Sequence, residues 1–214
     1  MKRILYAGDS TVKFNRFDSY PQTGISQGLL LYLKDDVFLR SFAENGRSTK
    51  SFIDEGRLRE IENTIAEGDV FLIQIGHNDA KMDDPLRYTE AYGSFQENLK
   101  RMADVARRVG AFPVLITPVA RRYFDKDGQF LGGSHGEYPK AMKELAEREN
   151  VPYIDLNAIS ENYLECVGDL ASRPMYVYPK DNTHLTYHGA VIYAGMIARE
   201  LKKLGEPYGD LLLI

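Results

Sequence analysis

The sequence has 214 residues, 43% of them apolar and 27% charged, which is typical of a soluble globular protein, and we expect one domain over residues 1–214. Its net charge of −4 predicts no general attraction to nucleic acid or to anionic membranes, so neither is expected as a partner. No apolar stretch approaches the roughly 20 residues of a membrane span. The single cysteine, Cys166, excludes an internal disulfide and a cysteine-based zinc cluster. It lies in a helical-looking stretch, where we expect a buried, unreactive thiol.

The first residues do not resemble a signal peptide. Lys2 and Arg3 are followed by an apolar run of only Ile4–Ala7, whereas a signal peptide has an apolar region of about 7–15 residues. We therefore expect a cytoplasmic protein, unless a leader was removed from this chain.

Strand-like and helix-like segments alternate along the chain. The predicted strands are Lys2–Ala7, Val37–Phe42, Val70–Ile75, Phe112–Thr117 and Pro152–Leu156. The predicted helices are Gly24–Leu33, Arg57–Ala66, Thr89–Val109 with Thr89 as its cap, Glu137–Glu149, Asn157–Leu170 and His188–Leu204. This alternation predicts an α/β fold, with a parallel sheet covered by helices on both faces. The glycine-containing segment 119–136 is predicted to be a surface loop beside the site, with room for a short hairpin.

Two polar motifs lie near opposite ends of the chain. Gly8-Asp9-Ser10 follows the first predicted strand, and Asp181-Asn182-Thr183-His184 precedes the last predicted helix. A serine hydroxyl is a weak nucleophile, which needs a base and a group that orients the base. Asp181 and His184, three residues apart, can supply both. Either motif alone is more typical of an ordinary polar turn.

Two further motifs follow the second and third predicted strands: Asn45-Gly46-Arg47 and Gly76-His77-Asn78-Asp79. In a parallel sheet, the loops that follow the strands gather at the carboxyl edge, where open α/β folds place their chemistry. We therefore expect these motifs to assemble one site together with Ser10.

The four ordered motifs resemble those of the SGNH (GDSL-type) hydrolase superfamily, over nearly the whole chain. Gly8-Asp9-Ser10-Thr11 and the block Asn45–Thr49, continued by Phe52–Arg57, are similar to the rhamnogalacturonan acetylesterase-like branch. The resemblance implies a three-layer α/β/α sandwich with a five-stranded parallel sheet, the flavodoxin-like SGNH fold. It also implies ester hydrolysis through an acyl-enzyme, with acetylated pectic oligosaccharide as the expected substrate.

The roles follow the chemistry of a serine hydrolase. Ser10 is the expected nucleophile, His184 the base and Asp181 the group that orients it. The backbone N–H groups of Ser10 and Gly46 and the side-chain amide of Asn78 are expected to hold the oxyanion. Such a site needs no cofactor, and the four histidines with their scattered carboxylates suggest no metal site.

The remaining polar residues of the motifs have simpler interpretations. We expect Asp9, His77 and Asp79 to organise their loops, and His77 is also kept as a candidate substrate contact. His188 lies seven residues from Asp181, so we expect it to start the last helix or to line the pocket, as another candidate contact.

Cations near the site are candidate contacts for an acidic sugar, although a solvated surface charge is the commoner role for any one of them. They are Lys13, Arg47, Arg121 and Arg122. His135 is expected to be a solvated loop residue. The stretch Met175–Tyr178 fits core packing and a platform for a sugar ring about equally well.

Other functions remain open at this point. A lipid esterase, thioesterase, lysophospholipase or acetylxylan-type esterase would use the same motifs. A non-catalytic carbohydrate-binding protein is a further alternative, which the complete set of motif residues disfavours. The sequence leaves open the sugar, the position of the acetyl group and the oligomeric state.

Overall fold

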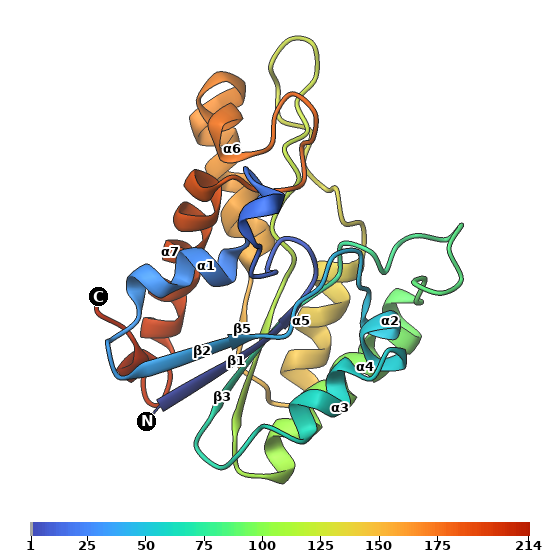
Figure 1. Ribbon diagram of the computed structural model, residues 1–214. Coiled ribbons are helices and arrows are strands. Elements are labelled where there is room, and N and C mark those ends of the chain that lie inside the picture. Colours follow the sequence, from blue (N-terminus) through green and yellow to red (C-terminus); the bar gives the residue numbers. More distant parts are fainter. Residues whose placement is uncertain (1) are drawn as a thin grey trace.

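The computed structural model describes residues 2–214 and contains a sheet of five parallel strands (Figure 1). The strands are β1 Lys2–Gly8, β2 Val37–Ser41, β3 Val70–Gln74, β4 Phe112–Ile116 and β5 Tyr153–Ile154. They lie in the order β2-β1-β3-β4-β5, and each neighbouring pair is parallel. This is the flavodoxin-like order, so the predicted five-stranded fold is confirmed.

Helices cover both faces of the sheet (Figure 1). On one face lie α1 Ile25–Leu29, α6 Leu156–Ser172 and α7 Tyr187–Lys203. On the other lie α2 Thr49–Asp54, α3 Arg57–Glu62, α4 Gln96–Arg108 and α5 Tyr138–Arg148. The result is the three-layer sandwich expected from the alternating sequence pattern.

Alternate residues of each central strand enter different cores. In β1, Ile4 and Tyr6 belong to the cluster under α1 and α7, whereas Leu5 and Ala7 belong to the cluster under α3, α4 and α5. The same alternation holds in β3 and β4. Because both faces are covered, these strands read as continuous apolar runs.

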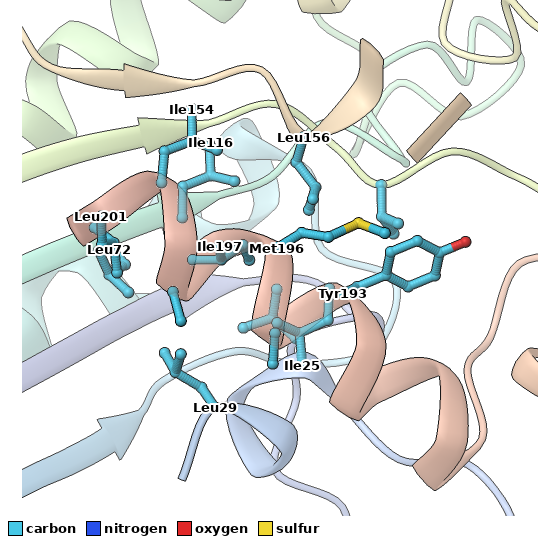
Figure 2. Packing of buried hydrophobic residues seen from close by; sticks show 14 of the residues in the cluster. Ile25, Leu29, Leu72, Ile116, Ile154, Leu156, Tyr193, Met196, Ile197 and Leu201 are labelled. Carbon is cyan, nitrogen blue, oxygen red and sulfur yellow. The ribbon is translucent and has the colours of Figure 1, made fainter. Parts of the chain in front are cut away.

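The hydrophobic core under α1 and α7 depends on a close approach of these two helices (Figure 2). Ile25 and Leu29 of α1 face Tyr193 and Ile197 of α7 across the cluster. A side chain at Gly28 would lie only 2.3 Å from the carbonyl oxygen of Ala190. The absence of a Cβ at this position therefore permits the packing that holds the last helix, and the segment before it, against the start of the chain.

The helix predicted over Thr89–Val109 begins differently from the prediction. A π-helical turn, Ala91–Phe95, precedes α4, and Gly93 has non-helical angles of φ −116° and ψ −111°. Thr89 does not cap this helix, because its hydroxyl donates to Asp79 Oδ1 at 2.9 Å. A tertiary hydrogen bond therefore replaces the expected local one.

Two other expectations need correction. The sequence did not predict α2, whose cap is Ser48, with its hydroxyl accepting from Ser51 N at 3.2 Å. Cys166 is exposed on α6 rather than buried, because this helix packs on the core through its other side, including Leu164. Over residues 2–214, the structure has no helix with the length and apolar character needed to span a membrane.

Candidate active site

Ser10, His184 and Asp181 form a continuous hydrogen-bonded chain. His184 Nε2 lies 2.9 Å from Ser10 Oγ, and His184 Nδ1 lies 2.6 Å from Asp181 Oδ2. Ser10 follows β1, whereas the other two residues precede α7, so the contact joins positions 174 residues apart. The structure thus brings together the three residues that the sequence singled out first.

The loop before α7 holds Asp181 as a carboxylate. Its Oδ1 accepts from the backbone N–H groups of Thr183 at 2.6 Å and His184 at 2.8 Å. Burial alone would raise the pKa of Asp181, but the hydrogen bonds from the His184 side chain and from both N–H groups outweigh it and lower the pKa. An ionised carboxylate accepts from Nδ1–H, which leaves the Nε2 lone pair of His184 facing Ser10.

Three hydrogen-bond donors lie on the loops around Ser10. Within residues 2–214, the N–H groups of Ser10 and Gly46 donate to no acceptor. Asn78 Nδ2 donates to the carbonyl oxygen of Arg47 at 3.1 Å, which uses one of its two hydrogens. Gly46 has φ +75°, a left-handed conformation that glycine adopts without strain. These donors remain available for a charge that develops on a substrate.

A buried pair connects the loops of Ser10 and Asn78. Asp9 Oδ2 lies 3.0 Å from His77 Nδ1, and Asp9 Oδ1 accepts from Thr11 N at 2.9 Å and Thr11 Oγ1 at 2.8 Å. Burial acts to raise the pKa of Asp9, but His77 and Thr11 together lower it to about 2. The expected role of Asp9 and His77 in organising the loops agrees with these contacts.

Asp79 joins the same loop to α2. Its carboxylate accepts from Thr49 N at 3.0 Å, Thr49 Oγ1 at 2.6 Å and Thr89 Oγ1 at 2.9 Å. Burial is the largest influence and raises the pKa of Asp79 to about 7, although the bonds from both threonines oppose it. The contacts of Asp79 are structural, as expected from the sequence. They lie with Thr49 and Thr89, which are 30 and 10 residues away, rather than within the loop of Asp79 itself.

Arg121 fastens two of the motif loops to each other. Its Nη1 donates to Thr183 Oγ1 at 2.7 Å, and its Nη2 donates to the carbonyl oxygen of His77 at 3.1 Å. The sequence placed Arg121 near the site as a candidate substrate contact, and it does lie there. Its bridging role could not be read from the sequence, because its two partners are 44 and 62 residues away.

Arg122 is enclosed by protein partners. It is 2% exposed, and its guanidinium donates to Ser172 Oγ at 3.0 Å, to Asn182 Oδ1 at 3.2 Å and to Asp169. All three of its nitrogens are thus engaged. These contacts favour a structural role for Arg122, which links the segment after β4 to Asn182, over the predicted substrate contact.

The other candidate contacts are more open. Arg47 Nε donates to Glu55 at 2.7 Å, and Arg47 lines a cavity of about 280 Å³ together with Gly46. Lys13 pairs with Glu44 at 2.5 Å. His188 is exposed in the first turn of α7, outside the hydrogen-bonded chain that His184 completes.

The expectation of a solvated His135 is wrong. Its side chain is buried, and its Nε2 lies 2.9 Å from the carbonyl oxygen of Val119. Its ring packs edge-to-face with the ring of His77, with 4.5 Å between the ring centres. Burial disfavours the charged ring and lowers the pKa of His135 to about 3. A glycine-containing loop has no periodic pattern that would have revealed which of its residues turn inward.

The tyrosines of Met175–Tyr178 have separate environments. Tyr176 is buried, and its hydroxyl donates to the carbonyl oxygen of Ala120 at 2.9 Å. Tyr178 is partly exposed beside the guanidinium groups of Arg122 and Arg173. Core packing thus explains the first tyrosine, while the second lies on the surface near the site. Among residues 2–214 no group of three or more His, Cys, Asp or Glu side chains is arranged to hold a metal ion.

Comparison with known proteins agrees with this geometry. Residues 6–192 match the GDSL-like Lipase/Acylhydrolase family. The chain is 40% identical to the rhamnogalacturonan acetylesterase RhgT of Bacillus subtilis strain 168, over 99% of this chain and 94% of that protein. A probable rhamnogalacturonan acetylesterase of the same strain, YesY, is 38% identical over 98% of this chain and 97% of its own length.

Solved structures show the same architecture. The crystal structure of Bacillus subtilis YxiM has a TM-score of 0.85 and 29% identity, and the match covers 97% of this chain and 58% of that chain. The acetylxylan esterase Axe2 of Geobacillus stearothermophilus has a TM-score of 0.66 over 92% of this chain and 93% of its own, but its 16% identity shows the fold alone. On its sequence match and its similarity to RhgT and YesY, the chain belongs to the GDSL-like lipase/acylhydrolase family.

Proposed function

We propose that this protein is a serine esterase that removes acetyl groups from pectic, rhamnogalacturonan-type carbohydrate through an acyl-enzyme. The observation that carries the proposal is the continuous chain of contacts from Asp181 through His184 to Ser10, at 2.6 and 2.9 Å. Both distances lie within the hydrogen-bond reach that a nucleophile and its base require.

The first half of the reaction acylates the enzyme. Ser10 Oγ attacks the carbonyl carbon of the acetyl ester while His184 Nε2 accepts the hydroxyl proton. Asp181 stabilises the imidazolium that forms. The same proton then passes to the departing sugar oxygen as the carbon–oxygen bond to the sugar breaks, which leaves acetate esterified to Ser10.

The second half returns the enzyme to its starting state. His184 removes a proton from water, the resulting hydroxide adds to the acetyl carbon, and the proton returns to Ser10 as acetic acid leaves and then ionises to acetate. In both halves the carbonyl oxygen becomes negative, and the N–H groups of Ser10 and Gly46 and the free amide hydrogen of Asn78 are the donors for it. Each such donor typically contributes about 3–4 kcal/mol to the transition state.

The substrate class is supported by the relatives and by the surroundings of the site. Two similar proteins that the chain matches almost end to end are described as rhamnogalacturonan acetylesterases, one of them as probable. The cavities beside Gly46 and beside Asn182 are lined by many charged side chains, including Arg47, Glu55 and Lys126. Such linings suit a hydroxylated sugar better than a long acyl chain, whose CH₂ groups each gain about 0.8 kcal/mol from apolar burial.

The test is a comparison of acyl lengths and of natural substrates. We expect kcat/KM on aryl esters to be highest for acetyl, lower for butyryl and very small for octanoyl. Acetylated rhamnogalacturonan oligosaccharides should release acetate without cleavage of their backbone, measured by acetate assay and mass spectrometry. A rise of kcat/KM from two to eight acyl carbons would instead assign the protein to the lipid esterases. The expected cytoplasmic location and one-domain organisation remain predictions.

A further inference from the structure

A cavity of about 430 Å³, here called the side cavity, lies beside the loop that carries Asp181 and His184. Its wall comes from the segment after β4, the end of α6 and the segment before α7, which meet at one end of the molecule (Figure 1). The lining residues used below are Arg122, Tyr123, Lys126, Asp169, Arg173 and Tyr178. Acyl transfer at Ser10 uses none of them, so the side cavity has no assigned role in the reaction.

The side cavity and the proposed catalytic triad of Ser10, His184 and Asp181 share one loop, residues 177–184. Val177 N donates to the carbonyl oxygen of His184 at 2.9 Å, and Asp181 N donates to that of Val177 at 3.1 Å, so the loop is a compact turn. Tyr178 and Asn182 of this turn line the side cavity, while Asp181 and His184 complete the triad. A ligand in the side cavity therefore lies against the turn that holds the base.

Arg122 fixes the opposite wall to this turn. Its backbone N–H donates to the carbonyl oxygen of Asn182 at 2.8 Å, and its Nη1 donates to Asn182 Oδ1 at 3.2 Å. Because Arg122 is buried and each of its three guanidinium nitrogens donates to a protein acceptor, this wall is already formed without a ligand. A preformed wall reduces the entropic cost of binding.

The side cavity has an excess of positive charge in a protein whose net charge is −4. Arg122 and Arg173 share the single carboxylate of Asp169. Lys126 also lines the side cavity and has no ion-pair partner within residues 2–214. Asp125 is the only other carboxylate of the lining, so three cations face two anions.

Arg173 has guanidinium N–H groups that are not hydrogen-bonded within residues 2–214. In the part of the chain that the structure describes, only its Nη2 has a hydrogen-bond acceptor, Asp169 Oδ2 at 2.5 Å. Its guanidinium carbon lies 5.0 Å from the ring centre of Tyr178. Tyr123 adds a second partly exposed ring to the same lining. A guanidinium fork matches the planar geometry of a carboxylate, and aromatic rings offer apolar area to the CH groups of a sugar.

We propose that the side cavity binds a uronate residue of the substrate chain, apart from the sugar whose acetyl group reaches Ser10, and that Arg173 and Lys126 hold its carboxylate. This inference rests on the proposed function, since it names a second sugar of the same substrate. It makes the charge of the carbohydrate chain, rather than the ester alone, a determinant of specificity.

The experiment compares Lys126→Gln and Arg173→Gln with wild type on three acetyl esters: a rhamnogalacturonan oligosaccharide, a neutral xylo-oligosaccharide and an aryl acetate. The measured quantity is the ratio of kcat/KM for the acidic oligosaccharide to that for each of the other two. Because hydrogen bonds to charged groups contribute about 1.5–3 kcal/mol, each variant should lower both ratios by about tenfold or more, mainly through KM. Lys140→Gln is the matched control, since Lys140 is an exposed lysine of α5, on the other face of the sheet.

A direct binding measurement separates this inference from the proposed function. Calorimetry with an unacetylated rhamnogalacturonan oligosaccharide requires no hydrolysis, and Lys126→Gln should weaken binding by a similar factor. If wild type hydrolyses the acidic ester but neither variant changes the ratios or the binding, the inference is overturned while the esterase function stands. Equal losses on acidic and neutral oligosaccharides would overturn it too. Because Lys126 makes no ion pair within residues 2–214, its variant decides the question even if Arg173→Gln fails to fold.

Discussion

Asp9 and His77 form a buried hydrogen-bonded pair beside the nucleophile, with Oδ2 and Nδ1 3.0 Å apart and side chains 1% and 3% exposed. The pair joins the loop after β1, which carries Ser10, to the loop after β3, which carries Asn78. The positions of nucleophile and amide donor are therefore coupled through two side chains that need not touch the substrate. A site built in this way depends on its supporting hydrogen bonds as well as on its reacting groups.

The first prediction concerns the stability that Asp9 provides. Its pKa lies at about 2 in the folded protein, below the ordinary value of 3.8. A lowered carboxyl pKa contributes stability above pH 3.8, and this contribution is lost as the pH falls from about 4 toward 2. The shift corresponds to about 2 kcal/mol of unfolding free energy. Asp9→Asn should lack this contribution, so urea unfolding at about pH 6 and pH 3 should show a smaller acid-dependent loss than in wild type. An unchanged pH dependence in the variant would show that the contacts of Asp9 with His77 and Thr11 do not stabilise the folded protein.

The second prediction concerns the nucleophile. Ser10→Ala should lower kcat on aryl acetate by at least about 10³-fold, because within residues 2–214 the hydroxyl that contacts His184 Nε2 is that of Ser10. Its melting temperature should stay close to that of wild type, since only one hydroxyl group is lost. A folded variant that keeps more than a small fraction of the activity would show that Ser10 is not the nucleophile.

The third prediction distinguishes the two histidines before and at the start of α7. His184 bridges Ser10 and Asp181, whereas His188 is exposed in the first turn of the helix. His184→Ala should reduce kcat by several orders of magnitude, and His188→Ala by less than about tenfold. Steady-state kinetics on the same acetyl ester measures both. The opposite ranking would assign the base to His188.

The fourth prediction concerns the amide donor. Asn78→Ala should lower kcat by about 10²–10³-fold with little change in KM, because the bond to the oxyanion forms in the transition state. The variant also loses the bond to the Arg47 carbonyl oxygen, so its folding should be checked by circular dichroism. Asn78→Asp is a useful companion, since it keeps the shape but places a negative charge next to the developing oxyanion. A large rise in KM at constant kcat would make Asn78 a substrate-binding residue instead.

Local patterns were enough to predict an α/β fold with a parallel sheet, and the position of the motifs in it. Short apolar runs such as Val70–Ile75 are typical of strands covered on both faces, and their alternation with helices determines a parallel sheet. Once the sheet is parallel, the loops after its strands must meet at one edge, so the sequence alone groups Ser10, Gly46 and Asn78. The pairing of Asp181 with His184 is likewise local, because the hydrogen bonds between them join residues three positions apart.

Only the tertiary structure determines the contacts between residues that lie far apart in the sequence. Arg121 spans 44 and 62 residues to its partners, and Asp79 spans 30 residues to Thr49. His135 turns inward from a glycine-containing loop, and no periodic pattern in the sequence marks the buried side of such a segment. The side cavity arises in the same way, from segments that approach one another only when the helices pack on the sheet. Short-range periodicity and the direction of the chain determine secondary structure and topology, whereas the partner of a long polar side chain depends on the packing of distant elements.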